Sequence, residues 1–295
     1  SSTFTISNGT RQGSVASPAF WNIYLDPLFT ALREMGVGCH IGGIFMGVVG
    51  YADDLILLAP SRHAAQMMLK KCEQFCAENN IQFSTDEDPS RSKSKAIYVV
   101  GPRGGGLPRP VPLRLCGRPL PWVERAEHLG HALHQDGLMA QDCREKRAQM
   151  IDSSVKVRES FDFAHPAEQI LAVSKYCSAA YGSNLWDLGS REAEMLTNAW
   201  RTGHKLAWDV PRHCRTFLVQ TVLAPHDGSL RASLLNRSVG FFRGLLDSPS
   251  REVTVMALLA SRDVRSSLGS NLALVRELSG LDPWVAGRAH LRAAL

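Results

Sequence analysis

The chain has 295 residues, 44% of them hydrophobic and 21% charged, with a formal net charge of +5. This composition predicts a globular protein with a sizeable core and argues against disordered or collagen-like chains. No apolar run reaches the ~20 residues of a membrane span, and the seven scattered cysteines, with no signal peptide in view, predict reduced thiols in a nuclear or cytoplasmic protein that is not secreted.

Positive charge is unevenly distributed along the chain. Residues 1–100 contain 8 Lys and Arg against 9 Asp and Glu, whereas residues 101–295 contain 25 against 19. An Arg-rich second part suits a polyanion such as nucleic acid. An excess of this size is also common on helical surfaces, so both interpretations stay open.

The first predicted helix follows an extended segment and a Gly-containing loop in residues 1–16. Ser17 as N-cap and Pro18 in the first turn predict where it begins. Pro27 should bend or interrupt it, because proline removes a helical hydrogen bond. Apolar residues continue at helical spacing: Phe20, Ile23, Tyr24 and Leu28.

Two short apolar runs, residues 44–49 and 55–59, flank an acidic pair and predict a hairpin-like arrangement. Ser61 is positioned to cap a second helix over residues 61–79. One apolar stripe of that helix predicts that both of its methionines are in the core. The stripe consists of Ala65, Met68, Leu69, Cys72 and Phe75.

Strands are predicted near residues 81–85 and 95–100. "GPRGGGLPRPVP", residues 101–112, then predicts a loop or linker. Its glycines do not predict a phosphate cradle, because its prolines prevent a helix from starting there.

Further strands are expected near 112–116, 119–123 and 126–131. From about residue 139 the pattern is helical, near 140–163, 166–184, 189–206, 229–246, 251–262 and 269–279. The order predicts an α+β fold, mixed first and all-α afterwards.

The chemistry centres on Asp53 and Asp54, in the run "VVGYADDLILLAP". Ionised carboxylates are costly to bury unless a cation meets them. Adjacent strand residues point to opposite faces, so only a turn brings both carboxylates toward one place. Such a pair suits Mg²⁺, which takes one or two carboxylates together with phosphates and water. For an isolated pair, an exposed Asp-Asp turn is the ordinary alternative.

The upstream stretch "NGTRQGSVASPAFWNIY", residues 8–24, joins a Gly-flanked loop to the first predicted helix. Gly9 and Gly13 allow a close approach of the backbone. Arg11 can contact phosphate, and Gln12 can hydrogen-bond a base edge or a sugar. Taken alone, the loop is equally a helix-entry turn with a surface arginine.

Together these stretches resemble a known pair. "GTRQGSVASPAFWNIYLD" followed by "YADD" 27 residues after Tyr24 resembles motifs B and C of a reverse transcriptase palm, most similar to LINE-type (non-LTR) retrotransposons. Residues 82–101 resemble motif D, with Lys93-Ser94-Lys95 in place and Asp88-Pro89 instead of Asn-Pro. Residues 120–133 resemble motif E, the primer grip, with His128 instead of the usual aromatic residue.

The resemblance implies a partial palm with a primer-grip-like end over residues 1–137 and a helical thumb and C-terminal region over residues 138–295. It implies an RNA-directed DNA polymerase acting by two-metal nucleotidyl transfer at the YADD turn. The implied cofactor is Mg²⁺, with Mn²⁺ possible. The implied partners are an RNA template, a DNA primer and dNTP.

Individual roles follow from the same resemblance. Asp53 and Asp54 would ligate the metals, while Tyr51 and Ala52 would shape the turn. Lys93, with Lys95 second, would neutralise or protonate the leaving pyrophosphate; an ordinary solvated turn is the equal alternative. The template–nucleotide pocket would be lined by Arg11, Gln12 and Gly13.

The family's third metal-binding aspartate, in motif A, has no counterpart here, since residues 1–25 contain no Asp. The chain is therefore expected to be a polymerase fragment that lacks the N-terminal fingers and palm segment, with little activity of its own. The alternative is a non-catalytic relic or a nucleic-acid-binding helical module.

Candidate phosphate contacts occur on the first helix of the thumb-like region. The alternative for this basic cluster is a solvated face with i,i+4 partners such as Asp142 with Lys146. The basic cluster consists of Arg144, Lys146, Arg147, Lys156 and Arg158.

The histidines at 128, 131 and 134 predict a structural or surface role, because a spacing of three alternates faces in a strand.

Overall fold

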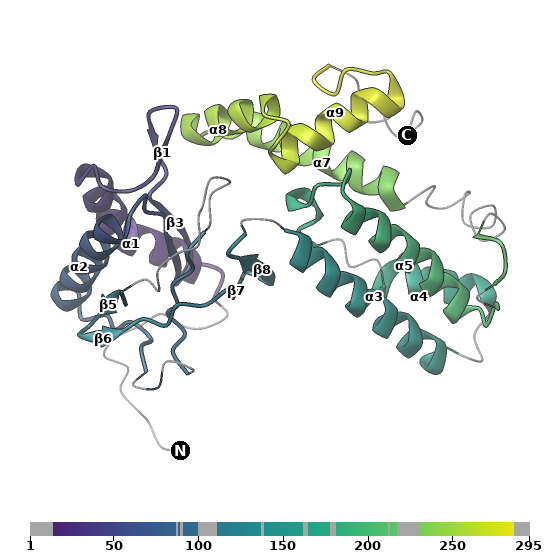
Figure 1. Cartoon of the computed structure of the whole chain (residues 1–295), viewed down its shortest axis with the longest axis horizontal. Helices are drawn as coiled ribbons and strands as arrows, with labels where there is room; N and C mark the ends of the chain where they lie inside the picture. The colour runs from purple at the N-terminus through teal and green to yellow at the C-terminus, as the bar shows by residue number, and fades with distance from the viewer. Residues whose placement is uncertain are drawn as a thin grey trace. The chain divides into compact units, whose positions relative to one another are not determined.

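The chain forms two compact units, Ser1–Glu124 and Arg125–Leu295. The first combines helices with small antiparallel sheets, and the second adds one hairpin to a set of helices, as the α+β prediction expects (Figure 1). This computed structural model describes residues 14–86, 88, 91–99, 111–136, 139–161, 165–177, 181–211, 213–216 and 230–285.

Helix α1 spans Ser17–Glu34. Pro18 lies in its first turn as predicted, but Ala16, not Ser17, is the N-cap residue, and it already has a helical backbone. The helix continues through Pro27, so the predicted interruption is wrong. Proline removes one backbone donor, and the burial of Leu28 and other apolar residues on both sides outweighs that loss.

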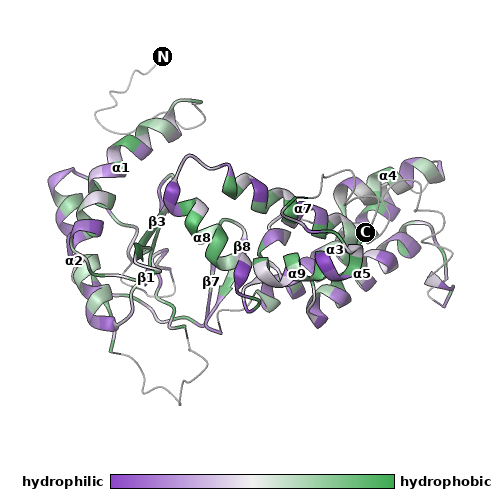
Figure 2. Ribbon diagram, turned by 90° about the horizontal axis from the view of Figure 1, so that it is seen from above, coloured by the Kyte–Doolittle hydropathy of each residue, from purple (hydrophilic) through white to green (hydrophobic). Residues whose placement is uncertain are grey.

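Helix α2 spans Arg62–Glu78. Its predicted cap is confirmed, because Ser61 Oγ accepts a hydrogen bond of 3.1 Å from the Ala64 amide. Hydrophilic and hydrophobic residues lie on different sides of α2 (Figure 2). Met68 is fully buried while Met67 is 37% exposed, so only one methionine is in the core. The core between α1 and α2 contains Leu25, Leu28, Leu32, Met68, Cys72 and Phe75.

The strands of the first unit pair only as hairpins. No ladder forms over 81–85 or over the described residues of 95–100, so these two strand predictions are wrong. Ala96 makes one isolated bridge to Trp122 instead. Residues 101–110 of the predicted loop lie outside the described residues. The strands are β1 (His40–Ile41), β2 (Ile44–Phe45), β3 (Val48–Tyr51), β4 (Asp54–Leu57), β5 (Arg114–Leu115) and β6 (Arg118–Pro119).

The second unit begins with the hairpin of β7 (Arg125–His128) and β8 (His131–His134). The single strand predicted near 126–131 is therefore two strands, because Leu129 and Gly130 both have positive φ and reverse the chain. The predicted helices occur as α3 (Ala140–Ser160), α4 (Pro166–Tyr176), α5 (Arg191–Ala207), α7 (Leu230–Leu246), α8 (Arg251–Arg262) and α9 (Ser267–Ser279), with a short 3₁₀ turn η1 (Ser183–Leu185). None of the described helices combines the length and apolar character needed to cross a bilayer.

Helices α3 and α5 run parallel and make the most extensive contact among the described elements of this unit. Arg144 meets Glu192 at the start of both helices, and Arg158 meets Asp209 at their ends. Between these pairs, a Cβ at Gly203 would lie 2.3 Å from Ser154 Oγ. Glycine at this position therefore allows the two backbones to approach.

Candidate active site

The acidic pair occurs at the end of the hairpin of β3 and β4. Tyr51 pairs with Asp54, which leaves Ala52 and Asp53 as a two-residue turn. The predicted turn between two strands is therefore confirmed. Ala52 has φ +51°, a left-handed conformation that costs an L-residue about 1 kcal/mol or more.

One face of the hairpin packs against α1. A Cβ at Gly50 would lie 2.4 Å from Cζ of Phe29, so the missing side chain makes room for that ring. Val48, Leu55 and Leu57 pack against the same core as α1 and α2. The opposite face carries Tyr51, which is 65% exposed. The core thus fixes the hairpin while its end remains in solvent.

Asp53 and Asp54 are both exposed. Neither takes part in an ion pair among the described residues, so no internal cation competes for their oxygens. Two adjacent exposed carboxylates fit the donor set of Mg²⁺ or Mn²⁺. Within the described ranges no group of three or more His, Cys, Asp or Glu side chains is arranged to hold a metal.

Tyr51 and Ala52 belong to the same hairpin as the aspartates, and the structure describes only part of the other predicted residues of this site. Arg11, Gln12 and Gly13 lie outside the described residues. Lys93 is exposed, and no hydrogen bond or ion pair connects it to Asp53 or Asp54 in the part that the structure describes.

The segment that carries Lys93 is nevertheless ordered by its neighbours. Buried Ser92 donates its hydroxyl to the Ser94 carbonyl oxygen at 2.8 Å, and Ser94 donates its amide to the Ser84 carbonyl oxygen at 3.3 Å. These bonds hold the backbone around Lys93, whose side chain is exposed.

The basic cluster on α3 is largely paired with acids. Arg144 Nη2 lies 3.1 Å from Glu192 Oε1, and Arg158 Nη2 lies 2.6 Å from Asp209 Oδ1. Lys156 forms an i,i+4 pair of 2.6 Å with Asp152. Phosphate binding by these side chains would have to displace those carboxylates.

The cluster also does not form one surface. At 100° per residue, Arg144, Arg147 and Arg158 lie within about 60° of one another around α3, and Lys146 and Lys156 lie on other sides. Lys146 donates to Gln149 Oε1 at 3.4 Å. The predicted pairing of Lys146 with Asp142 is wrong, because Asp142 is buried and accepts bonds elsewhere.

Asp142 joins the β7–β8 hairpin to the helices. Its Oδ2 accepts a 2.7 Å bond from Trp186 Nε1 and lies 3.2 Å from His131 Nδ1, and its Oδ1 accepts a 3.1 Å bond from the Ala132 amide. His131 is 7% exposed and stacks on Tyr181 with ring centroids 5.0 Å apart. His131 therefore has a structural role, although the single strand on which that prediction rested is a hairpin in which His128 pairs with His131.

Asn271 extends this network toward α9. Its Oδ1 accepts the Leu188 amide at 2.8 Å, and its Nδ2 donates to the Trp186 carbonyl oxygen at 2.9 Å. No short sequence pattern indicates Asp142 or Asn271, because their partners lie 44 and 85 residues away along the chain.

Residues 1–130 match the family model described as "Reverse transcriptase (RNA-dependent DNA polymerase)". The Pol polyprotein of type-2 retrotransposable element R2DM of Drosophila melanogaster is 29% identical over 84 residues, which cover 28% of this chain and 8% of that relative. The Pol polyprotein of type-1 retrotransposable element R2 of Popillia japonica is 30% identical over 131 residues, which cover 43% of this chain and 18% of that relative.

A putative 115 kDa protein in type-1 retrotransposable element R1DM of Drosophila melanogaster is 28% identical over 125 residues, which cover 42% of this chain and 11% of that relative. The matched segments thus span less than a fifth of each of these three relatives. The similarity covers the unit that carries the β3–β4 hairpin and extends to the turn of β7 and β8.

Proposed function

From the premise that residues 1–130 belong to the reverse transcriptase family and resemble non-LTR retrotransposon polymerases, we propose that this chain is the later palm and thumb of an RNA-directed DNA polymerase. The observation that carries the proposal is the hairpin end, where Asp53 and Asp54 are exposed on a strand pair fixed to a core. It would act on an RNA template, a DNA primer and dNTP.

Asp53 and Asp54 are the residues that would hold the catalytic Mg²⁺, or Mn²⁺ in its place. When bound, the metal supplies positive charge to the phosphoryl oxygens of nucleotidyl transfer. The chain's own contribution is placement, because two consecutive exposed carboxylates lie at the end of a hairpin that packs on a core. Tyr51, exposed on the same face, is available to contact the primer end.

Lys93 is our candidate for neutralising or protonating the leaving pyrophosphate, with Lys95 second. Negative charge develops on that group during the transfer, so a mobile ammonium on an ordered base suits the task. Arg11, Gln12 and Gly13 are proposed to line the template–nucleotide pocket, on the strength of their place in the Arg-Gln-Gly loop.

The resemblance also implies a third metal-binding aspartate, and residues 1–25 contain no Asp. We therefore expect the 295-residue polypeptide to extend a primer weakly or not at all by itself. A metal-bound catalytic unit that lacks one ligand loses orders of magnitude in rate.

The helical unit is proposed to act as the thumb, which holds the template–primer duplex by phosphate contacts. Arg147 is the most available member of the α3 cluster, since it is exposed and shares a side with Arg144 and Arg158. Arg144, Lys156 and Arg158 would first have to leave their carboxylate partners.

Metal-directed cleavage tests the proposed site independently of polymerase activity. Fe²⁺ with ascorbate should cut the 295-residue chain beside residues 52–55, and excess Mg²⁺ should suppress the cut. Asp53→Asn and Asp54→Asn should abolish it, while Asp26→Asn, which changes an exposed aspartate on α1, should not. Equal cleavage in all three variants would contradict the proposal.

A further inference from the structure

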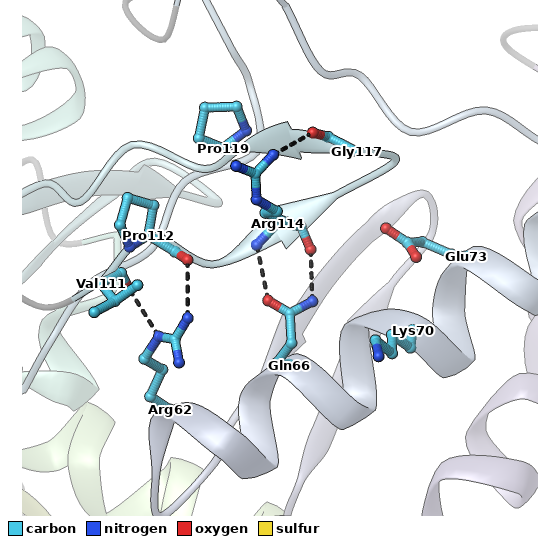
Figure 3. A pocket seen from close by; sticks show the side chains of 9 residues that line it. All are labelled: Arg62, Gln66, Lys70, Glu73, Val111, Pro112, Arg114, Gly117 and Pro119. Carbon is cyan, nitrogen blue, oxygen red and sulfur yellow. Dashed lines mark hydrogen bonds between the residues drawn. The ribbon is translucent and has the colours of Figure 1, made fainter.

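A shallow groove of about 480 Å³ lies between α2 and the β5–β6 hairpin, within the first unit. Its α2 side is formed by residues at helical intervals that share one side of the helix, within about 80° at 100° per residue. The apolar part of its wall comes from Val111, Pro112 and Pro119. The α2 residues are Arg62, Gln66, Lys70 and Glu73, shown with the opposing Arg114 in Figure 3.

Two guanidinium groups of the groove are held in place by backbone carbonyls. Arg62 donates from Nε to the Val111 carbonyl oxygen at 2.8 Å and from Nη2 to the Pro112 carbonyl oxygen at 3.3 Å. Arg114 donates from Nη1 to the Gly117 carbonyl oxygen at 2.9 Å (Figure 3). Carbonyls orient these cations without neutralising them, and fixing them beforehand lowers the entropy cost of binding a ligand.

Positive charge exceeds negative charge in the lining of the groove, which contains three cations and the carboxylate of Glu73. Lys70 is exposed and makes no hydrogen bond or ion pair among the described residues, and Arg62 and Arg114 form no ion pair there either. The one carboxylate of the lining, Glu73, accepts a hydrogen bond from the Cys116 amide. Three cations therefore face one occupied carboxylate, in contrast to the acid-paired arginines of α3.

The size of the basic edge matches a strand of nucleic acid. From Arg62 to Lys70 the helix rises about 12 Å at 1.5 Å per residue. For a stacked strand with the rise of about 3.4 Å per nucleotide found in a duplex, that length corresponds to roughly three or four nucleotides. A shallow groove with cations on both sides and an apolar wall of Val111, Pro112 and Pro119 suits a phosphodiester backbone with sugars against that wall.

We infer that this groove binds the phosphate backbone of a nucleic-acid strand, through Lys70, Arg62 and Arg114, as a site separate from Asp53 and Asp54. The site requires no metal and no polymerase activity. Its failure and the failure of the proposed polymerase site are therefore distinguishable, because groove binding is measured without metal whereas the Asp53 and Asp54 site is measured by metal-directed cleavage.

The test is binding of labelled 12-nucleotide RNA and DNA of one sequence to the 295-residue chain by fluorescence anisotropy across a salt series. Lys70→Gln should weaken binding about 3- to 10-fold near 0.1 M salt and reduce the slope of log K against log salt by about 0.7, the value for one single-strand phosphate contact. Arg114→Gln should act in the same direction.

Lys71→Gln is the matched control, with the same charge change one residue away and 100° around the helix. It should leave both the affinity and the salt slope near those of the wild type.

Equal losses of affinity with RNA and DNA indicate recognition of the phosphates, and a larger loss with RNA indicates an added contact to the sugar. Both outcomes support the site. Absent binding, identical effects of Lys70→Gln and Lys71→Gln, or an unchanged slope in Lys70→Gln overturns the inference.

Discussion

The Nδ1 atom of His131 lies 3.2 Å from Oδ2 of Asp142, and both side chains are buried. This contact ties the β7–β8 hairpin to the first helix of the second unit. A carboxylate that accepts bonds from His131, Ala132 and Trp186 leaves few unsatisfied lone pairs in the interior. The hairpin is thus fixed to the helices by a buried polar contact.

Asp142→Asn should lower the free energy of unfolding by about 2–4 kcal/mol, because the amide presents a donor where Trp186 and His131 need an acceptor. Urea denaturation followed by tryptophan fluorescence measures the change. Asp152→Asn is the control, because its salt bridge to Lys156 is at the surface, where such pairs contribute little to stability. It should leave the free energy of unfolding close to that of the wild type. Equal effects of the two variants would contradict the structural role of Asp142.

Gly203→Ala should destabilise the second unit by roughly 1–3 kcal/mol, because the new Cβ would lie 2.3 Å from Ser154 Oγ and force α3 and α5 apart. Gly244→Ala, in α7, meets nothing within 4 Å and should stabilise by up to about 1 kcal/mol through helix propensity. Thermal unfolding of both variants shows whether each substitution stabilises or destabilises the protein. A stabilising Gly203→Ala would show that the two helices are not in close contact.

Ala52→Gly should raise the free energy of unfolding by about 0.5–1 kcal/mol. Relief of the left-handed strain at φ +51° exceeds the extra backbone entropy that glycine gives the unfolded chain. Ala65→Gly in α2 should instead cost about 1 kcal/mol. Chemical denaturation of both variants provides the comparison, and similar losses in the two would mean that Ala52 is unstrained.

Alkaline conditions should weaken the fold through two buried thiols. Burial raises the pKa of Cys72 and of Cys143 from the ordinary 9.0 to about 12, and neighbouring acidic groups add to the effect. Between pH 9 and about 12 the unfolded chain has lost these protons while the folded chain keeps them, so stability falls as the pH rises.

Urea denaturation at pH 8, 9.5 and 10.5 measures this decline. Cys72→Ala should make it shallower, since the variant has no thiol at that position to titrate. Met68→Leu changes the same core without removing a thiol and should lower stability by a similar amount at each pH. If stability fell as steeply with pH in Cys72→Ala as in the wild type, the Cys72 thiol would not contribute to the decline.

Primer extension with an RNA template, dNTP and Mg²⁺ should yield little product from the 295-residue chain. Adding a segment of a related polymerase that carries the third aspartate should restore extension, and Asp53→Asn should prevent the restoration. Robust extension by the chain alone, abolished by Asp53→Asn, would show that these 295 residues suffice and that a third aspartate from outside them is not needed.

Local signals predicted the helices and the acidic turn well. Ser61 caps α2 as its position indicates, and Asp53 lies in the turn that the flanking apolar runs predict. Each depends on atoms within a few residues, which a sequence displays directly. The family resemblance rests on the same kind of local pattern.

Features that depend on distant partners were not predictable. Ile81 and Phe83 alternate as in a strand, and both pack against the α1–α2 core, yet no neighbouring strand supplies a ladder. Asp142 lies in the first turn of α3, where acidic residues are ordinarily exposed, and only folding shows that it is buried. Gln66 and Lys70 likewise look like ordinary polar positions of a helix surface until β5 is placed beside them.

The side chain of Gln66 has a consequence for association between chains. Its Nε2 donates to the Arg114 carbonyl oxygen and its Oε1 accepts from the Arg114 amide, both at 2.8 Å, as a neighbouring β-strand would. Open strand edges are templates for intermolecular sheet growth. By occupying both main-chain groups at this position, the glutamine amide protects β5 from pairing with a strand of another molecule.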